Sequence, residues 1–319
     1  MAPPAVSLPR AEAVTLAHQA AGVTVRGNRA LTIGVVIVGV WLLAAMAAPL
    51  ISRQSPVDVD VMNRLQAPSL GHLFGTDEAG RDNFSRIIHG ARISIPAALG
   101  VIVVATVVGS VVGAVAGYSG GRVDEVLMRV VDVVLAFPSI LLAMAITAAL
   151  GLGLKHAMLA MILVWWPEFA RLMRGQVLAT KANDYVTSAR ALGAETWRVL
   201  GVHVIPNALP PIVVKATLDI GYAIVLIAAL SFLGLGAVPP EPEWGAMIAA
   251  GRTKFEYWWV GTFPGLAILS VVFGFNFLGD GLQDWLNPRL RTSSGPPRSW
   301  PPIPARAAPR QGRGTRGRR

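Results

Sequence analysis

The sequence predicts an all-α polytopic membrane protein with about six transmembrane helices. Of its 319 residues, 53% are hydrophobic and only 14% are charged, whereas a soluble domain of this length needs a more polar surface. Long apolar runs recur along the chain, and the Lys and Arg residues collect on alternate sides of these runs. The chain contains no cysteine, which excludes disulfides and cysteine-ligated metals.

Six apolar segments are candidates for membrane spans, because a hydrocarbon core of about 30 Å needs roughly 20 apolar residues per helix. The first carries no charge, and we interpret it as an uncleaved anchor rather than a signal peptide, since a long segment precedes it. The fourth is the shortest and ends in three charged residues, which places its last turn at an interface. The predicted spans are 30–51, 93–118, 130–154, 157–175, 212–235 and 257–279.

The distribution of basic residues predicts the orientation of these spans. With six spans, 20 of the 28 Lys and Arg residues fall on the side that also holds both termini, and this side is expected to be the cytoplasm. The sequence therefore divides into a cytoplasmic segment 1–29, the first helix 30–51, an extracytoplasmic segment 52–92, a membrane core 93–286 and a tail 287–319. The tail holds nine arginines and no acid, which is typical of a disordered basic segment near anionic lipid rather than a nucleic-acid reader.

Two features of the spans predict how they pack. Gly109, Gly113 and Gly117 recur every four residues, so on a helix they share one face that a neighbouring backbone can approach closely. Internal packing is the preferred interpretation, and packing around a transport pathway is the alternative. Pro138 lies inside the third predicted span, where it removes a backbone hydrogen bond and is expected to kink the helix.

Ionisable residues at membrane depth are candidates for function. Asp132 lies three residues after Arg129, and Asp219 lies four residues after Lys215. Each acid therefore has a base on the same helical face, and local pairing is the expected arrangement. A place on a substrate or ion pathway is the alternative for both acids.

Several kinds of chemistry have no signature in the chain. The phosphate-binding pattern G-x-x-x-x-G-K-[ST] does not occur, and neither does H-E-x-x-H or another clustered histidine–carboxylate spacing. We therefore expect no cofactor, no metal and no catalysis in this chain itself.

One polar segment interrupts the hydrophobic half of the sequence. Residues 187–206 read TSARALGAETWRVLGVHVIP and lie in the connection 176–211 between the fourth and fifth spans. Tyr185, Ala189 and Leu192 recur at helical spacing as a narrow apolar stripe. The glycine that follows, Gly193, is placed to end this helix.

A second short helix is expected directly after that glycine. Trp197 lies near its start, and Pro206 is expected to stop it before the fifth span. The sequence thus predicts two short cytoplasmic helices joined at a glycine. A helix lying on the membrane surface is the alternative, because Arg and Trp side chains suit lipid headgroups.

At these residues the chain resembles the permease subunits of ATP-binding-cassette importers. That family carries E-A-A, three residues, Gly and, nine residues later, a hydrophobic–x–Leu–Pro ending in a cytoplasmic loop. Here Thr187-Ser188-Ala189, Gly193 and Ile205-Pro206 fall at those spacings, with His203 in the hydrophobic position. Histidine at that position is usual in the dipeptide and oligopeptide members.

Further motifs extend the resemblance from about residue 71 to residue 289, and the closest kin look like C-type subunits of dipeptide and oligopeptide importers. The matching stretches stand in the family's order. They are HLFGTDEAGRDNFSRIIHGARIS at 72–94, GYSGGRVDEVLMRVVDVVLAFP at 117–138, LSFLGLG at 230–236, PEWGAMI at 242–248 and FNFLGDGL at 275–282.

Three positions depart from the family pattern. Thr187 replaces the usual acidic residue, so a charged contact with an ATPase would be lost there. Ile227 stands where many relatives carry glutamate, which affects substrate contacts on the pathway. Asn287-Pro288 replaces the common Asp-Pro.

The resemblance implies a type I importer permease fold in a bacterial plasma (inner) membrane. It implies a second homologous permease subunit, two ATPase subunits that hold ATP and Mg²⁺, and an extracytoplasmic substrate-binding protein. Tyr185, Thr187, Ala189, Leu192, Gly193, Trp197 and Pro206 would form the coupling segment that docks on an ATPase. The substrates would be di- or oligopeptides, with nickel chelates or glutathione as alternatives.

Two rival functions come from other classes. A stand-alone secondary transporter would use Asp132 and Asp219 as coupling acids and would work without ATPase subunits. A membrane scaffold would bind partners and transport nothing.

Overall fold

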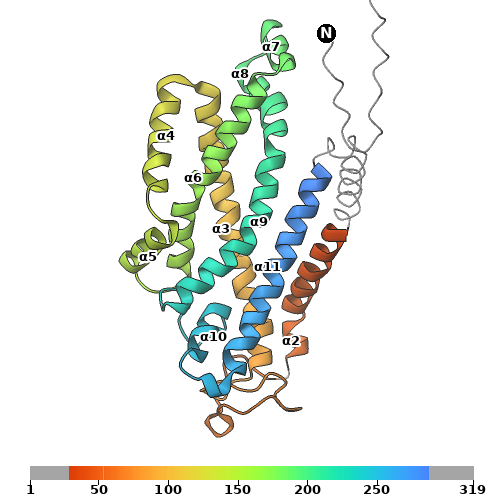
Figure 1. Ribbon diagram of the computed structural model, residues 1–319, viewed down its shortest axis with the longest axis vertical. Helices are drawn as coiled ribbons and strands as arrows, with labels where there is room; N and C mark the ends of the chain where they lie inside the picture. The colour runs from red at the N-terminus through yellow and green to blue at the C-terminus, as the bar shows by residue number, and fades with distance from the viewer. Residues whose placement is uncertain (1–28, 53, 287–319) are drawn as a thin grey trace, which may run out of the picture.

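The computed structural model describes residues 29–52 and 54–286, and this part of the chain contains helices and no β-strand. The molecule is elongated, with most of the long helices running along its length (Figure 1). The predicted N-terminal segment and the basic tail, together with Asn287-Pro288, lie outside the described residues. The first helix is Arg29–Met46, and the later elements are α2 (Ala48–Ile51), η1 (Val61–Asn63), α3 (Asn83–Ser119), α4 (Gly121–Leu135), α5 (Ser139–Leu150), α6 (Leu154–Lys181), α7 (Asp184–Ala191), α8 (Thr196–Arg198), η2 (Val199–Val204), α9 (Ile205–Phe232), α10 (Trp244–Gly251), η3 (Phe255–Tyr257) and α11 (Trp259–Leu286).

The described residues contain four helices that are long and apolar enough to cross a membrane, or five if the bent pair α4–α5 counts as one span. The prediction of about six spans is therefore not confirmed as a number. The difference lies in the predicted fourth span, which falls within α6. That helix has 28 residues, but it carries charged side chains at 155, 168, 171, 174 and 181 along its length.

The predicted third span is broken rather than gently kinked. Helix α4 ends at Leu135, α5 begins at Ser139, and the two helix axes differ by 86°. Pro138 occupies the N-cap position of α5, where its missing N–H removes no helical hydrogen bond. The proline thus marks the corner, as the sequence predicted.

The glycine stripe on α3 forms the contact with α6. A Cβ atom added to Gly109, Gly113 or Gly117 would come within 3.0 Å of a backbone carbonyl oxygen on α6. The three oxygens belong to Trp166, Ala170 and Arg174, which follow the same four-residue repeat. The two helices therefore approach with almost no side chain between them.

The first helix packs on α11 through glycines as well. A Cβ on Gly34, Gly274 or Gly281 would clash with the other helix of this pair. The Trp41 indole N–H also donates to Ser270 Oγ at 3.0 Å. The first helix is thus fixed to the core by the last one, which lies beside it in Figure 1.

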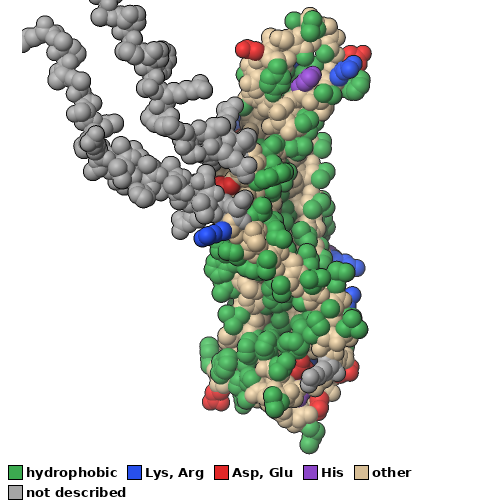
Figure 2. Space-filling view, turned by 90° about the vertical axis from the view of Figure 1, so that its right-hand side faces the viewer, with side chains coloured by type: hydrophobic (Ala, Val, Ile, Leu, Met, Phe, Trp, Pro, Cys, Tyr) green, Lys and Arg blue, Asp and Glu red, His purple; other side chains and the backbone are tan. Residues whose placement is uncertain are grey.

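The segment between the first helix and α3, which the sequence predicts to be extracytoplasmic, closes the end of the molecule that holds α10 (Figure 1). The Trp259 indole N–H donates to Thr76 O at 3.1 Å, and the Trp244 indole N–H donates to Ile87 O at 2.9 Å. Arg86, with a buried side chain, donates to Pro56 O at 2.7 Å. Hydrophobic side chains cover much of the length of the face drawn in Figure 2, as expected for a protein with lipid as part of its solvent.

Candidate functional site

The coupling segment predicted between the fourth and fifth spans forms α7, α8 and η2 at the end of the molecule opposite to α10 (Figure 1). Helix α7 ends as expected at Gly193, which has φ +83°. The Gly193 N–H donates to Arg190 O at 2.9 Å, and the Ala194 N–H donates to Ala189 O at 3.1 Å. These two bonds make a complete Schellman motif, so the glycine fixes the angle between the two halves of the segment.

The second half of the coupling segment does not end at Pro206, contrary to the prediction. The chain is helical without a break from Thr196 to Phe232, and Pro206 lies in the first turn of α9 instead of ending a helix. The residues before it, Val199–Val204, form a π-helix, a wider turn that accommodates a missing donor. The Asn207 side chain donates to His203 O at 2.7 Å, which satisfies one of the carbonyls near the proline.

Three buried valines, one from α7 and two from η2, hold this segment to the membrane helices: Val186, Val199 and Val204. A polar contact adds to them at Tyr118, the penultimate residue of α3. Lys181 Nζ donates to Tyr118 O at 2.6 Å, and both Lys181 and Arg190 lie 5.2 Å from the centre of the Tyr118 ring. A cation over the face of an aromatic ring is attracted to it by a cation–π interaction. Tyr118 on α3 therefore contacts both α6, through Lys181, and α7, through Arg190. Sequence reasoning missed this residue, because the contact joins elements far apart in the chain.

Three large apolar or aromatic side chains of the coupling segment are exposed among polar neighbours. Leu192 is 89% exposed, Trp197 is 70% exposed and Tyr185 is 45% exposed. Ala189 is only partly accessible, whereas Thr187 is exposed. An exposed Trp and Leu on a short rigid element are typical of a protein contact surface.

The predicted acids of the spans pair across helices as well as along them. Asp219 Oδ2 lies 2.8 Å from Lys215 Nζ, as the local spacing predicted, and the same ammonium donates to Glu168 Oε2 at 2.9 Å. Asp132 does not pair with Arg129. It accepts from Arg171 at 2.6 Å instead.

Asp132 does not meet Arg129 because Arg129 has another partner. Ile227, the third candidate for the pathway, lies in a different place. Arg129 lies 4.0 Å from Glu125, one turn before it on α4, which leaves Asp132 free to meet Arg171 on α6. Ile227 is 1% exposed and packs in the hydrophobic core, so its side chain faces the interior of the subunit.

Comparison with known proteins identifies the family. Residues 109–292 match the family described as "Binding-protein-dependent transport system inner membrane component". The chain belongs to this family. It is 44% identical over 265 residues to a probable D,D-dipeptide transport system permease protein, DdpC, of Escherichia coli (strain K12), covering 83% of this chain and 89% of that one.

Two further relatives cover a similar share of the permease. A dipeptide transport system permease protein, DppC, of Alkalihalophilus pseudofirmus is 42% identical over 266 residues, covering 83% of this chain and 88% of that one. A glutathione transport system permease protein, GsiD, of Pectobacterium atrosepticum is 43% identical over 236 residues, covering 74% of this chain and 78% of that one. The protein is therefore a multi-pass membrane permease component, and such components are not themselves catalytic.

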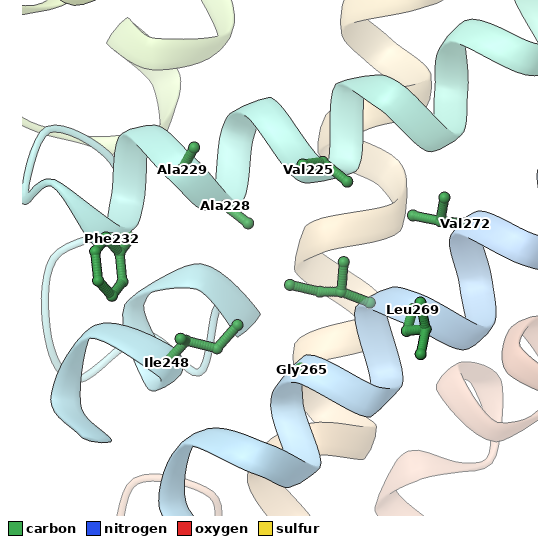
Figure 3. A pocket seen from close by; sticks show the side chains of 9 residues that line it. Val225, Ala228, Ala229, Phe232, Ile248, Gly265, Leu269 and Val272 are labelled. Carbon is green, nitrogen blue, oxygen red and sulfur yellow. The ribbon is translucent and has the colours of Figure 1, made fainter. Parts of the chain in front are cut away.

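Two of the open hollows in the described part of the chain differ in character. One lies among α9, α10 and α11, has a volume of about 440 Å³ and is lined only by apolar residues, with Phe232 and Ile248 at one end and Val272 at the other (Figure 3). The other lies between α4, α6 and α9 and is partly charged. Within residues 29–52 and 54–286, no three His, Asp or Glu side chains are grouped so that they could hold a metal ion.

A buried carboxylate holds α10 in place. Glu243 is 1% exposed and accepts hydrogen bonds from the Gly245 and Ala246 N–H groups at 3.0 and 2.9 Å, which caps α10. Ser94 on α3 lies 3.3 Å from the same carboxylate. Burial raises the pKa of the Glu243 carboxyl above its usual value, against the lowering effect of these hydrogen bonds.

This raised pKa predicts the pH dependence of stability. A carboxyl with a raised pKa in the folded state favours folding most below its unfolded pKa, and that contribution is lost as pH rises towards the folded value. We expect Glu243→Gln, which cannot titrate, to gain thermal stability relative to the native permease as pH rises from 4.5 to 8. Melting of the purified complex at several pH values measures this difference. Glu241→Gln, an exposed neighbour, serves as the control and should show no such trend.

Proposed function

We propose that this permease forms half of the translocation pathway of an ATP-driven importer for di- and oligopeptides. A second homologous permease subunit completes the pathway, two ATPase subunits hold ATP and Mg²⁺, and an extracytoplasmic binding protein delivers the peptide. The relatives named above are permeases for dipeptides, D,D-dipeptides and glutathione, and all of these substrates contain amide-linked amino acids. Glutathione or a nickel chelate is the alternative substrate.

The observation that carries the coupling role is the exposure of Tyr185, Leu192 and Trp197 on a segment whose two halves are fixed by the Schellman motif at Gly193. The G-x-x-x-x-G-K-[ST] nucleotide pattern does not occur in the chain, and in this proposal the partner ATPases supply the energy. When the ATPases close on ATP, they move this rigid segment, and the continuous helix from Thr196 to Phe232 passes the movement into the membrane. Switching between inward- and outward-facing states follows, because packed helix interfaces are bistable.

The proposed orientation places this segment and both termini in the cytoplasm. The basic residues collect on that side, as cytoplasmic loops require. Reporter fusions at the two termini, active only in the cytoplasm or only outside it, test this arrangement.

The rival of a secondary transporter is less well supported. Its two candidate coupling acids are both engaged in ion pairs, Asp132 with Arg171 and Asp219 with Lys215. Each of these two carboxylates therefore already has a basic side chain as its partner. Peptide uptake by cells with and without co-expressed ATPase subunits separates the two functions, and uptake without the ATPases would refute our proposal.

A variant of the exposed tryptophan tests the docking surface. We expect Trp197→Ala to lower ATP-dependent dipeptide uptake by about tenfold or more, because exposed aromatic anchors carry about 2 kcal/mol or more at interfaces. The ATPase subunits should also co-purify less with the variant permease. Trp285→Ala is the matched control, since Trp285 is 60% exposed near the end of α11 and lies outside the segment. Equal loss in both variants would contradict docking through Trp197.

A further inference from the structure

A charged groove opens on the membrane core between three helices. We define the charged groove by its lining residues, which come from the end of α4, from α6 and from α9. Its volume is about 650 Å³. The lining residues are Leu135, Glu168, Arg171, Leu172, Gly175, Gln176 and Lys215.

The α6 residues of the groove form a single stripe. They recur at helical spacing from Glu168 to Gln176, so one face of α6 provides most of the wall. Glu168 lies 13 residues before Lys181, the last residue of α6, which corresponds to roughly 20 Å along the helix. Lys215 lies ten residues into α9, or about 15 Å from its first residue. The charges of the groove therefore lie about 15–20 Å along α6 and α9 from the helix ends that adjoin the coupling segment, next to the interface predicted for the fourth span.

The charged side chains at this groove are exposed in the subunit, so lipid is an unfavourable neighbour for them. The Arg171 side chain is 57% exposed, Asp132 is 60% exposed and Glu168 is 43% exposed. An ionised side chain facing lipid tails costs about 2.5–3.5 kcal/mol or more, so an acyl environment on this face is strongly unfavourable. Water on a translocation pathway satisfies all three groups at once.

The ion pairs leave free donors on Arg171 and a free acceptor on Glu168. Arg171 donates to Asp132 through Nη2 at 2.6 Å, and a guanidinium has five N–H donors in all. Glu168 accepts from Lys215 through Oε2 at 2.9 Å, which leaves Oε1 for a further donor. Arg171 follows Glu168 by three residues, so a cation and an anion stand one helical turn apart.

This arrangement matches one kind of ligand. A short peptide at neutral pH carries an ammonium at one end and a carboxylate at the other. We propose that the charged groove is the part of the pathway wall that holds both charged ends of a short peptide, with Arg171 facing the carboxylate and Glu168 facing the ammonium. In this arrangement Asp132 and Lys215 orient these two side chains. The proposal deepens the proposed function and rests on it.

The apolar hollow among α9, α10 and α11 does not compete for this role. All of its lining residues are apolar, and a peptide placed there would leave its amide groups and charged ends without partners. Burying such groups unpaired costs several kcal/mol. The charged groove is the one of these two hollows whose chemistry fits the cargo.

Cysteine labelling tests whether the charged groove is open to water and to peptide. Because the native chain has no cysteine, Gln176→Cys introduces a single thiol, at a lining residue that is in none of the ion pairs described. We expect a membrane-impermeant methanethiosulfonate reagent to label this thiol in inverted vesicles that contain the whole transport complex. Leu163→Cys is the control, since Leu163 is 46% exposed on α6 but does not line the groove. Labelling of Gln176→Cys as slow as that of the control would overturn the proposal, because lipid or the partner permease would then cover the groove.

Protection by peptide is the second measurement. Alanyl-alanine at about ten times its dissociation constant should slow labelling of Gln176→Cys by about tenfold. The same dipeptide with an acetylated amino end and an amidated carboxyl end should give no protection. Equal protection by both compounds, or by neither, overturns the recognition of charged ends.

A charge change at the same residue keeps the test independent of labelling. Gln176→Glu and Gln176→Lys alter the electrostatic potential of the groove without breaking an ion pair. We expect the two variants to change the ratio of anionic to cationic dipeptide uptake in opposite directions, by about threefold to tenfold. A tenfold change corresponds to about 1.4 kcal/mol. Unchanged preference in both variants, with normal uptake, overturns the inference alone. Absence of ATP-dependent dipeptide uptake by the native complex overturns the proposed function itself, and with it the peptide assignment of the groove.

Discussion

Gly113→Ala should sharply reduce the amount of folded permease in the membrane, although it adds only one methyl group. The added Cβ would come within 3.0 Å of Ala170 O on α6, and this is a backbone atom that cannot move aside alone. Either α3 and α6 separate along their length or the backbone distorts, and overpacking of this kind costs about 1–3 kcal/mol. We expect a lower melting temperature of the purified complex and several-fold less subunit in membranes by immunoblot. Gly113→Leu should remove the folded subunit.

Gly100→Ala is the matched control for this prediction. Gly100 lies on the same helix, and a Cβ there would meet only Met158 Cε at 3.5 Å, which is an ordinary contact at the flexible end of a side chain. The control should retain native abundance and melting temperature. Equal abundance and stability of Gly113→Ala and Gly100→Ala would show that the α3–α6 contact tolerates separation, contrary to the structure.

The glycine stripe and the glycine of the coupling segment could both be predicted from the sequence, for the same physical reason. Each depends on short-range geometry: four-residue spacing places Gly109, Gly113 and Gly117 on one face, and only a residue that tolerates positive φ ends a helix as Gly193 does. Pro206 was misinterpreted because a proline in isolation predicts a stop. A π-helical turn before it and its position in the first turn of α9 both accommodate it.

The charged contacts could not be predicted, because they depend on how distant helices pack. Arg171 and Asp132 are 39 residues apart, and Glu168 and Lys215 are 47 residues apart. Helix spacing within one segment could identify Lys215 as the partner of Asp219, and it could not identify Glu168 as the second acid at the same ammonium. The part of the candidate site that we propose recognises cargo is therefore visible only in the folded chain.

The number of membrane spans could not be predicted reliably from the sequence either. Composition predicts a span where a segment is apolar, yet α6 carries charges along its length and still packs against the glycine stripe of α3. Its charged face lines the charged groove, so a polar pathway and a membrane position are compatible in one helix. Hydropathy alone assigns such a helix poorly, because it averages the two faces.

Gly193→Val should abolish ATP-dependent transport while the complex still assembles in the membrane. Gly193 has φ +83°, and a Cβ built there meets no atom within 4 Å, so bulk is not the obstacle. The cost comes from the backbone: an L-residue in this conformation loses about 1–2 kcal/mol, and a β-branched side chain fits it worst. To escape this strained conformation, residue 193 is expected to change its backbone angles. The hydrogen bonds from the N–H groups of residues 193 and 194 to Arg190 O and Ala189 O would then be lost, and α7 could turn relative to α8.

The comparison with Gly193→Asn separates this mechanism from a general defect. Asparagine enters the left-handed region more readily than valine, so Gly193→Asn should keep much of the transport that Gly193→Val loses. Uptake of a labelled dipeptide, permease abundance and co-purification of the ATPases are measured together for both variants. Coupling through a fixed angle requires normal abundance with lost uptake for valine and partial uptake for asparagine. Normal transport by Gly193→Val would mean that the ATPase does not need the angle that this glycine fixes, and the coupling role assigned to it would be wrong.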